Sequence, residues 1–244
     1  MSNVKSFIEE LKQLSDNDCF SVHVPSLNKL VKFKAFSVKQ HKDLMKSILD
    51  GVEGSVSMYK VFNDIIFENC LDEVDFSIYD RNKILVDLRK QCISDTITIE
   101  DREYNLNDLQ DFKFVFDKEK EYTYKGITAV VKLPTLKEDT AITEKSIVEF
   151  GKFSSEDKKI GNSLNILLVY ELMKFIHSLK IDDTVITFDE ISAYDKKGVI
   201  DNLPLKLINN ILEYIADFKE FEQSLLTFSD GTKLVIDAGF LSNE

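Results

Sequence analysis

The sequence predicts an α+β protein: a mostly helical single unit with an N-terminal hairpin and a small central antiparallel sheet. Three observations support this class. Apolar and polar residues alternate near the N-terminus, several later segments carry apolar residues at helical spacing, and the period returns to two in the middle of the chain. The 244 residues are 43% hydrophobic and 11% aromatic, which is ordinary for a globular protein.

A first helix is expected over residues 4–14. Phe7, Ile8, Leu11 and Leu14 fall on one face of this helix, and the charged residues fall elsewhere. A face of this kind needs a surface on which to dock. We expect the chain's own core to cover it, and a partner protein is the alternative.

A β-hairpin is expected over residues 20–36. Pro25 ends its first strand, because proline has no backbone donor for a ladder. The alternation directs Lys32 and Lys34 outward. It also assigns four side chains to a core beneath the hairpin: Val22, Val24, Val31 and Phe33.

Three helices are expected after the hairpin. Ser37 suits the N-cap of the first, because its hydroxyl can accept from an unpaired amide, and Gly51 closes that helix. Apolar spacing indicates a second helix over residues 56–70 and a third ahead of Arg89 and Lys90. None would be stable alone, so we expect a small helical core capped by the hairpin.

The period changes to two after residue 95. We expect a small antiparallel sheet here, with a turn at Lys125-Gly126. The charged residues 117–121 fit a solvated turn between strands. The expected strands are residues 96–99, 112–116 and 127–133.

Helical spacing returns beyond residue 137. Thr187 or Asp189 can cap a short helix to Tyr194, and Pro204 suits the start of another helix. Two further helices, over 142–150 and 162–179, and a final hairpin over 225–236 complete the expected elements. The expected division is residues 1–95 for the N-terminal helix, hairpin and helical core, 96–140 for the sheet, and 141–244 for the helical region with its β-like tail.

Composition excludes several classes of function. A net charge of −12 and a pI near 4.8 argue against a nucleic-acid surface, which needs clustered Lys and Arg. The longest apolar run, residues 166–170, is too short to span a bilayer, and the N-terminus lacks a signal peptide, so we expect a protein that is cytosolic when made. The three cysteines suggest no disulfide framework or zinc site, and we expect buried thiols: Cys19, Cys70 and Cys92.

No catalytic motif is visible. Residues 51–54 lack the lysine and hydroxyl residue of a phosphate loop, and the three histidines are scattered. Carboxylates cluster at 72–75, 182–183 and 189–190, where solvated loops are favoured over an acid/base or cation site. We therefore expect no enzyme activity, no cofactor and no metal, with a hydrolase using one acidic cluster as a remote alternative.

Several segments form a recognisable pattern in their order and spacing: Val24-Pro25-Ser26, residues 31–39, residues 65–70, residues 76–80 and residues 85–89. This pattern resembles the baseplate hub assembly protein family of T-even-type contractile-tailed bacteriophages. The resemblance covers roughly the first half of the chain, and the second half is similar only loosely, through Leu133-Pro134-Thr135 and the tail. Lys34 and Gln40-His41 depart from the family pattern, which has arginine and acidic residues there.

The resemblance implies a chaperone-like factor needed to build the central hub of a contractile tail's baseplate. Its implied partners are phage hub proteins and the tape-measure protein, met in the host cytoplasm during assembly, with no nucleic acid or membrane involved. A stoichiometric structural component of the virion baseplate is the alternative. The residues assigned to interaction are Lys32, Lys34, Lys39 and Arg89.

Overall fold

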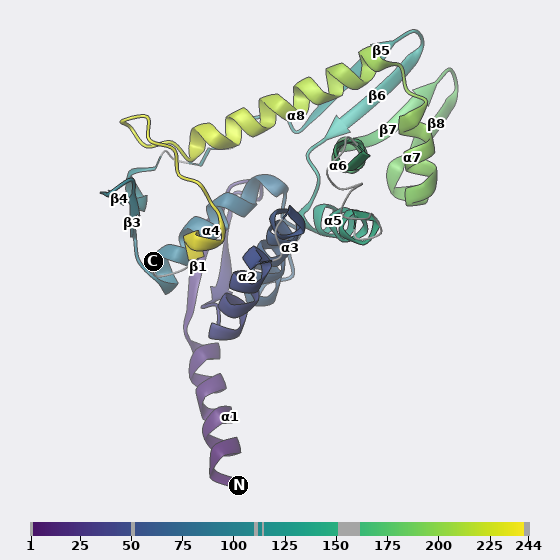
Figure 1. Cartoon of the computed structure of the whole chain (residues 1–244). Helices are drawn as coiled ribbons and strands as arrows, with labels where there is room; N and C mark the ends of the chain where they lie inside the picture. Colours follow the sequence, from purple (N-terminus) through teal and green to yellow (C-terminus); the bar gives the residue numbers. More distant parts are fainter. Residues whose placement is uncertain (1, 50–51, 110–111, 114, 151–161, 242–244) are drawn as a thin grey trace. The chain divides into compact units, whose positions relative to one another are not determined.

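The computed structural model describes residues 2–49, 52–109, 112–113, 115–150 and 162–241 (Figure 1). Helices and small antiparallel sheets confirm the α+β class. The chain divides into two compact units: unit 1 is Met1–Phe114 with Leu225–Glu244, and unit 2 is Val115–Ser224. The C-terminal segment therefore belongs to the same unit as the N-terminal hairpin.

Unit 1 is built from helices and two separate hairpins (Figure 1). Its helices are α1 (Ser2–Asn17), α2 (Val38–Leu49), α3 (Val52–Asn69) and α4 (Ile78–Cys92). The first hairpin pairs β1 (Cys19–Val24) with β2 (Lys29–Lys34), and the second pairs β3 (Thr96–Ile99) with β4 (Arg102–Asn105). Two 3₁₀ helices, η1 (Leu106–Asp108) and η4 (Ala238–Leu241), complete the unit.

The first hairpin has the predicted register and burial. Val22 pairs with Val31, and both are buried, as are Val24 and Phe33. The Phe33 ring stacks between Phe20, at a centroid distance of 6.5 Å, and Phe76, at 6.0 Å. Lys32 is exposed and Lys34 half-buried, so the polar positions lie on the other face of the hairpin.

A buried carboxylate joins this hairpin to α4. Asp80 has no exposed surface, and its Oδ1 accepts a hydrogen bond of 2.9 Å from the backbone N–H of Ser26 in the hairpin turn. Oδ2 accepts from the Ser26 hydroxyl and, at 2.9 Å, from the backbone N–H of Ser77, the N-cap of α4. One side chain thus completes the capping box of α4 and holds the turn between β1 and β2.

The cap of α2 lies where the sequence predicts it. The Ser37 hydroxyl accepts from the Gln40 amide at 3.3 Å, and Gln40 Oε1 accepts from the Ser37 N–H at 2.7 Å. Gln40 Nε2 also donates to Glu68 on α3 at 2.7 Å, which ties the two helices together. Gly51, predicted to close α2, lies outside the described residues.

The C-terminal tail differs from the expected hairpin. Leu225 is the last residue of α8 (Leu205–Leu225), and only Thr227 and Lys233 form an isolated bridge beyond it. The Leu234 N–H donates to the Leu226 carbonyl at 2.8 Å, so the pairing is brief. The tail instead uses apolar anchors, because Phe228, Leu234, Phe240 and Leu241 are all buried.

Unit 2 contains a four-stranded antiparallel sheet in the order β5-β6-β7-β8 (Figure 1). Its strands are β5 (Glu119–Tyr124), β6 (Ile127–Lys132), β7 (Ile176–Ile181) and β8 (Thr184–Thr187). Its helices are α5 (Leu136–Phe150), α6 (Asn162–Phe175), α7 (Ala193–Asp201) and α8, together with η3 (Phe188–Glu190).

Three predictions for residues 112–179 differ from the structure. Residues 112–116 do not form the expected strand in their described part, and Phe116 instead packs its ring against Tyr214, Phe218 and Phe221 of α8. Residues 119–121 belong to β5 and not to a turn, although residues 117–121 are exposed as expected; charged side chains suit this edge strand since they discourage further pairing. The helix expected over 162–179 ends at Phe175, and β7 begins at the next residue, Ile176.

Two smaller predictions in unit 2 are partly right. Lys125 and Gly126 have φ values of 49° and 80°, the geometry of the predicted tight turn between β5 and β6. Thr187 occupies the N-cap of η3, but the helix that includes Tyr194 starts later and is capped by Ser192. The helix that Pro204 precedes carries an apolar stripe of Leu207, Ile208, Ile211, Ile215 and Phe218, which are buried, while Leu212 is half-buried.

The hairpin register predicts unequal effects of two neighbouring substitutions. Phe33→Ala removes a fully buried ring and should lower the free energy of unfolding by about 3 kcal/mol or more. Lys32→Ala removes an exposed side chain and should change it by less than about 0.5 kcal/mol. Chemical denaturation measures both, and equal losses would show that the assigned register is wrong.

The role of Asp80 predicts a large effect of a small change. Asp80→Ala leaves the part-buried amides of Ser26 and Ser77 without their acceptor and should destabilise unit 1 by about 2–4 kcal/mol. Glu73→Ala, an exposed carboxylate in the preceding loop, is the matched control and should be nearly neutral. Thermal unfolding compares the two variants; similar melting temperatures would contradict the assignment.

Candidate protein-interaction surfaces

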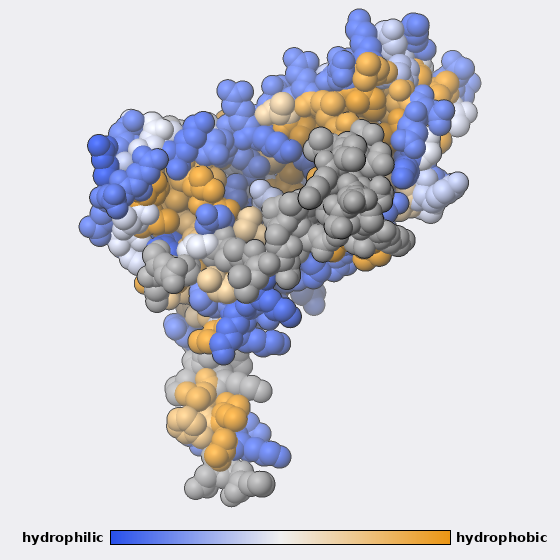
Figure 2. Space-filling model, in the orientation of Figure 1, coloured by the Kyte–Doolittle hydropathy of each residue, from blue (hydrophilic) through white to orange (hydrophobic). Residues whose placement is uncertain are grey.

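An exposed apolar stripe runs along α1. Val4, Phe7, Ile8 and Leu11 are 65%, 61%, 45% and 49% exposed, and Figure 2 shows apolar side chains gathered on this helix. Their spacing of three, four and seven residues places them on one face. The expectation that the chain's own core covers this face is therefore wrong for Phe7, Ile8 and Leu11, while the side chain of Leu14, the fourth residue of the predicted face, lies outside what the structure describes. The alternative, a partner protein, is the one that the exposure favours.

The remainder of α1 is typical of an amphipathic helix. Lys5, Glu9 and Glu10 are exposed, and the Ser6 hydroxyl donates to the Glu10 carboxylate at 3.4 Å. A helix of this length gains most of its stability from burial of its apolar face. The stripe defined by Val4, Phe7, Ile8 and Leu11 therefore has the chemistry of a docking surface.

The predicted interaction lysines lie on the hairpin and at the start of α2. Lys32 and Lys39 are exposed, and Lys34 is half-buried. The backbone N–H of Lys32, rather than its ammonium group, donates to Asp72 Oδ2 at 2.8 Å. The assignment of these lysines to a partner stays a prediction.

Two further lysines extend this set, although the sequence pattern did not single them out. Lys42 and Lys46 are exposed on α2 and follow Lys39 by three and seven residues. The local composition indicates a basic segment here, because residues 29–46 contain six lysines and one acidic residue, Asp43, in a chain of net charge −12.

Arg89, the fourth residue predicted to interact, differs from these lysines because it is buried. Its guanidinium donates to the Phe240 carbonyl and, at 3.2 Å, to the Thr96 carbonyl, and lies 5.4 Å from the centroid of the Phe240 ring. Burial lowers the pKa of this guanidinium. Arg89 therefore attaches the C-terminal segment to α4. The sequence could not reveal this contact, because Phe240 is 151 positions away from Arg89.

The acidic clusters do not converge into a catalytic arrangement in the described residues. Lys132 lies 3.4 Å from Glu138 and 3.6 Å from Asp189. His177 Nδ1 is 3.9 Å from Asp189 Oδ2, beyond hydrogen-bonding distance. Asp182 occupies the tight turn between β7 and β8 with φ 50°. Glu138 and Asp189 thus lie in ion-pairing range of Lys132, and Asp182 serves a turn.

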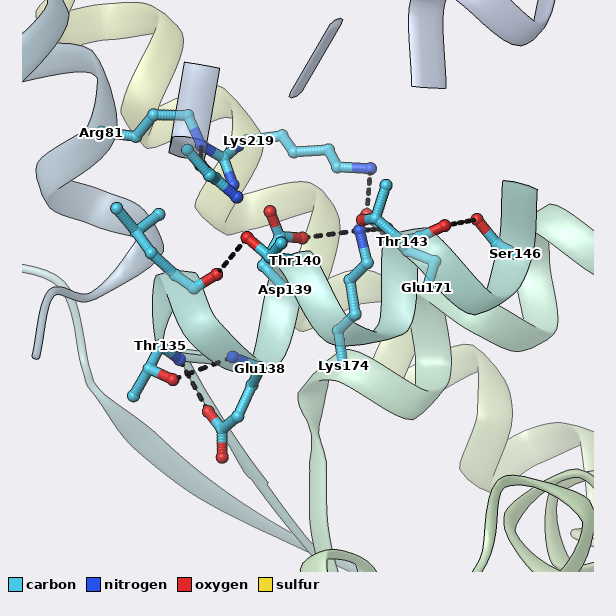
Figure 3. Close-up of polar contacts among 12 residues, drawn as sticks. Arg81, Thr135, Glu138, Asp139, Thr140, Thr143, Ser146, Glu171, Lys174 and Lys219 are labelled. Atoms are coloured by element: carbon cyan, nitrogen blue, oxygen red, sulfur yellow. Dashed lines mark hydrogen bonds and ion pairs between the residues drawn. The ribbon is translucent and has the colours of Figure 1, made fainter. Parts of the chain in front are cut away.

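A second polar network joins α5, α6 and α8 in unit 2. Figure 3 shows Lys174 reaching Asp139, at 2.6 Å, while Lys219 reaches Glu171 at 2.7 Å. Glu171 also lies 3.7 Å from Lys174, so the four charges alternate in sign. Asp139 is buried and its partner Lys174 largely so. This alternation neutralises the carboxylates and suits helix packing better than proton transfer.

Within the described ranges, no three His, Cys, Asp or Glu side chains are grouped to hold a metal ion. Across the same ranges, no helix combines the length and apolarity needed to cross a bilayer.

The cysteines are less buried than expected. Cys19 is exposed, while Cys70 and Cys92 are half-buried, so the prediction of three buried thiols is wrong. Burial raises the pKa of the Cys70 and Cys92 thiols, which makes them poorer nucleophiles than an exposed thiol. The alternating register explains Cys19, because it pairs with Lys34 on the outward face of the hairpin.

Comparison with known proteins matches residues 18–224 to the family model described as T4 bacteriophage base plate protein. The matched part contains the hairpin, its helical core and all of the four-stranded sheet, whereas α1 precedes it. No curated protein and no solved structure matches the chain. Because the match covers most of the sequence, this chain belongs to the T4 bacteriophage base plate protein family.

Proposed function

We propose that the protein is a chaperone-like assembly factor of the phage baseplate hub, acting by binding and not by catalysis. Membership of a base plate protein family supports a role in the tail. The finer role comes from the resemblance to hub assembly proteins in residues 24–89. Its partners would be hub components, the tape-measure protein, or both, met in the host cytoplasm before the tail is complete.

The exposed stripe on α1 carries this proposal. A contiguous apolar face on a folded chain is typical of a protein-binding surface. Phe7, the largest member of the stripe, is 61% exposed, so its ring is available to enter a groove on another protein. An assembly factor needs such a face to cover apolar surfaces of hub proteins until the correct partners arrive.

Binding through this stripe has a distinctive salt response. Burial of apolar surface supplies its driving force, and dissolved ions screen only charges. The complex should therefore persist at raised ionic strength. A stoichiometric baseplate component could use the same stripe, and the two roles differ in whether the protein is retained in purified virions.

The proposal predicts a specific assembly defect. A phage lacking this protein should make heads and outer baseplate parts but fail to make hubs, because hub surfaces are left uncovered. Electron microscopy of the knockout particles measures this, and mass spectrometry of wild-type virions should find the protein absent or minor. Normal contractile tails in the knockout would contradict the role, and a full virion complement would favour the structural component.

The proposal also predicts which residues bind. Phe7→Ser with Leu11→Ser should abolish retention of a hub protein or the tape-measure protein in co-expression pull-downs at raised salt. The melting temperature should stay unchanged, because both side chains are exposed. Leu205→Ser, at a residue 72% exposed in unit 2, is the matched control and should retain the partner. Equal retention by both variants would remove α1 from the interface.

A further inference from the structure

A row of lysines lies on the solvent face of α2. Lys39, Lys42 and Lys46 are exposed, while Gln40 and Leu44 on the opposite face are buried. Among the residues that the structure describes, none of these three ammonium groups has an ion-pair partner. We call these three residues the lysine row.

The surroundings of the lysine row are predominantly basic. Lys32 and Lys34 precede it on β2, and the segment 29–46 contains a single acidic residue, the exposed Asp43. Glu68 on α3 accepts from Gln40, and Asp72 accepts from the backbone N–H of Lys32. Lysines outnumber acidic residues in the segment 29–46, and this excess of positive charge suits an acidic ligand.

A protein ligand is favoured over nucleic acid. The chain carries a net charge of −12, which repels phosphate, and the segment 29–46 contains no arginine. A compact basic row on an acidic protein is instead complementary to a row of acidic residues on another protein. Opposite charges on the two rows would steer the association.

Such an acidic row is present on α8. Glu213, Asp217 and Glu220 are exposed, while Tyr214 and Phe218 on the opposite face are buried. The intervening Lys219 is engaged by Glu171 at 2.7 Å. Lys120 on β5 is a cation near this row, since the charges of Asp217 and Glu213 act on it. The row itself carries three exposed carboxylates.

The two rows have complementary spacing. The lysines are separated by three and then four residues, and the carboxylates by four and then three. Both rows span seven residues, about 10.5 Å along a helix. In antiparallel alignment, Lys39 meets Glu220, Lys42 meets Asp217 and Lys46 meets Glu213.

From this match we propose that two copies of the chain associate, with the lysine row of one copy against the acidic row of its partner copy. The inference does not rest on the proposed role in hub assembly. Each copy carries both a basic and an acidic row, so each copy can supply either side of the contact. Because the paired groups are exposed, the association is weak and sensitive to salt, unlike binding through α1.

Sedimentation equilibrium of the full chain tests the proposal. The average mass should exceed that of the monomer at about 50 mM salt and fall toward it at about 500 mM, where the Debye length is shorter. Lys42→Glu and Asp217→Lys should each weaken association about tenfold or more, because each places like charges opposite one another. Lys180→Glu, at an exposed lysine on β7, is the matched control and should associate like the wild type.

Mixing the two variants gives the decisive result. Glu at position 42 of one variant then faces Lys at position 217 of the other, and the remaining basic and acidic rows of the two variants are wild type. The mixture should recover association that neither variant shows alone. Lys46→Glu and Glu213→Lys provide an independent second pair, and circular dichroism confirms folding of all variants.

Three outcomes would overturn the inference: a wild-type monomer at low salt, no recovery in either mixture, or equal loss in Lys180→Glu. Tight binding of a labelled DNA duplex that Lys42→Glu abolishes would also overturn it, by assigning the lysine row to nucleic acid.

Discussion

The buried carboxylate of Asp80 is the constraint on which unit 1 depends. A fully buried carboxylate is costly unless its oxygens are hydrogen-bonded, and here the hairpin turn and the N-terminus of α4 supply the donors. This arrangement fixes the hairpin so that Phe33 contacts Phe76 beneath it. The outward face, with Lys32, is then presented to solvent on a rigid support.

Much of unit 1 could be predicted because its signals are local. The alternation from Val22 to Phe33 specifies both the strands and the buried face, and Ser37 caps α2 through a residue three positions away. Unit 2 was harder to predict. The strand β5 carries the charges of an edge, and the apolar run into Phe175 and Ile176 changes from helix to strand without a glycine or proline to mark the boundary.

The interaction surfaces could likewise be predicted only in part, because local sequence patterns do not show which residues become covered. An amphipathic pattern predicts that α1 has an apolar face, but the pattern is identical whether that face is covered or exposed, so Phe7 was wrongly assigned to the core. The use of Arg89 depends on Phe240, which is remote in sequence. The chain thus combines an apolar surface on α1 with separate basic and acidic rows on α2 and α8, and these differ in their expected response to salt.

Hydrogen–deuterium exchange, with and without a purified hub partner, tests the central claim that α1 is a docking helix left open in the free protein. The account predicts rapid exchange of α1 amides in the free protein and slow exchange in the complex. The β1–β2 amides should be protected in both states, because Asp80 and the core hold the hairpin. Protection of α1 in the free protein equal to that of the hairpin, or no change on adding the partner, would contradict the account.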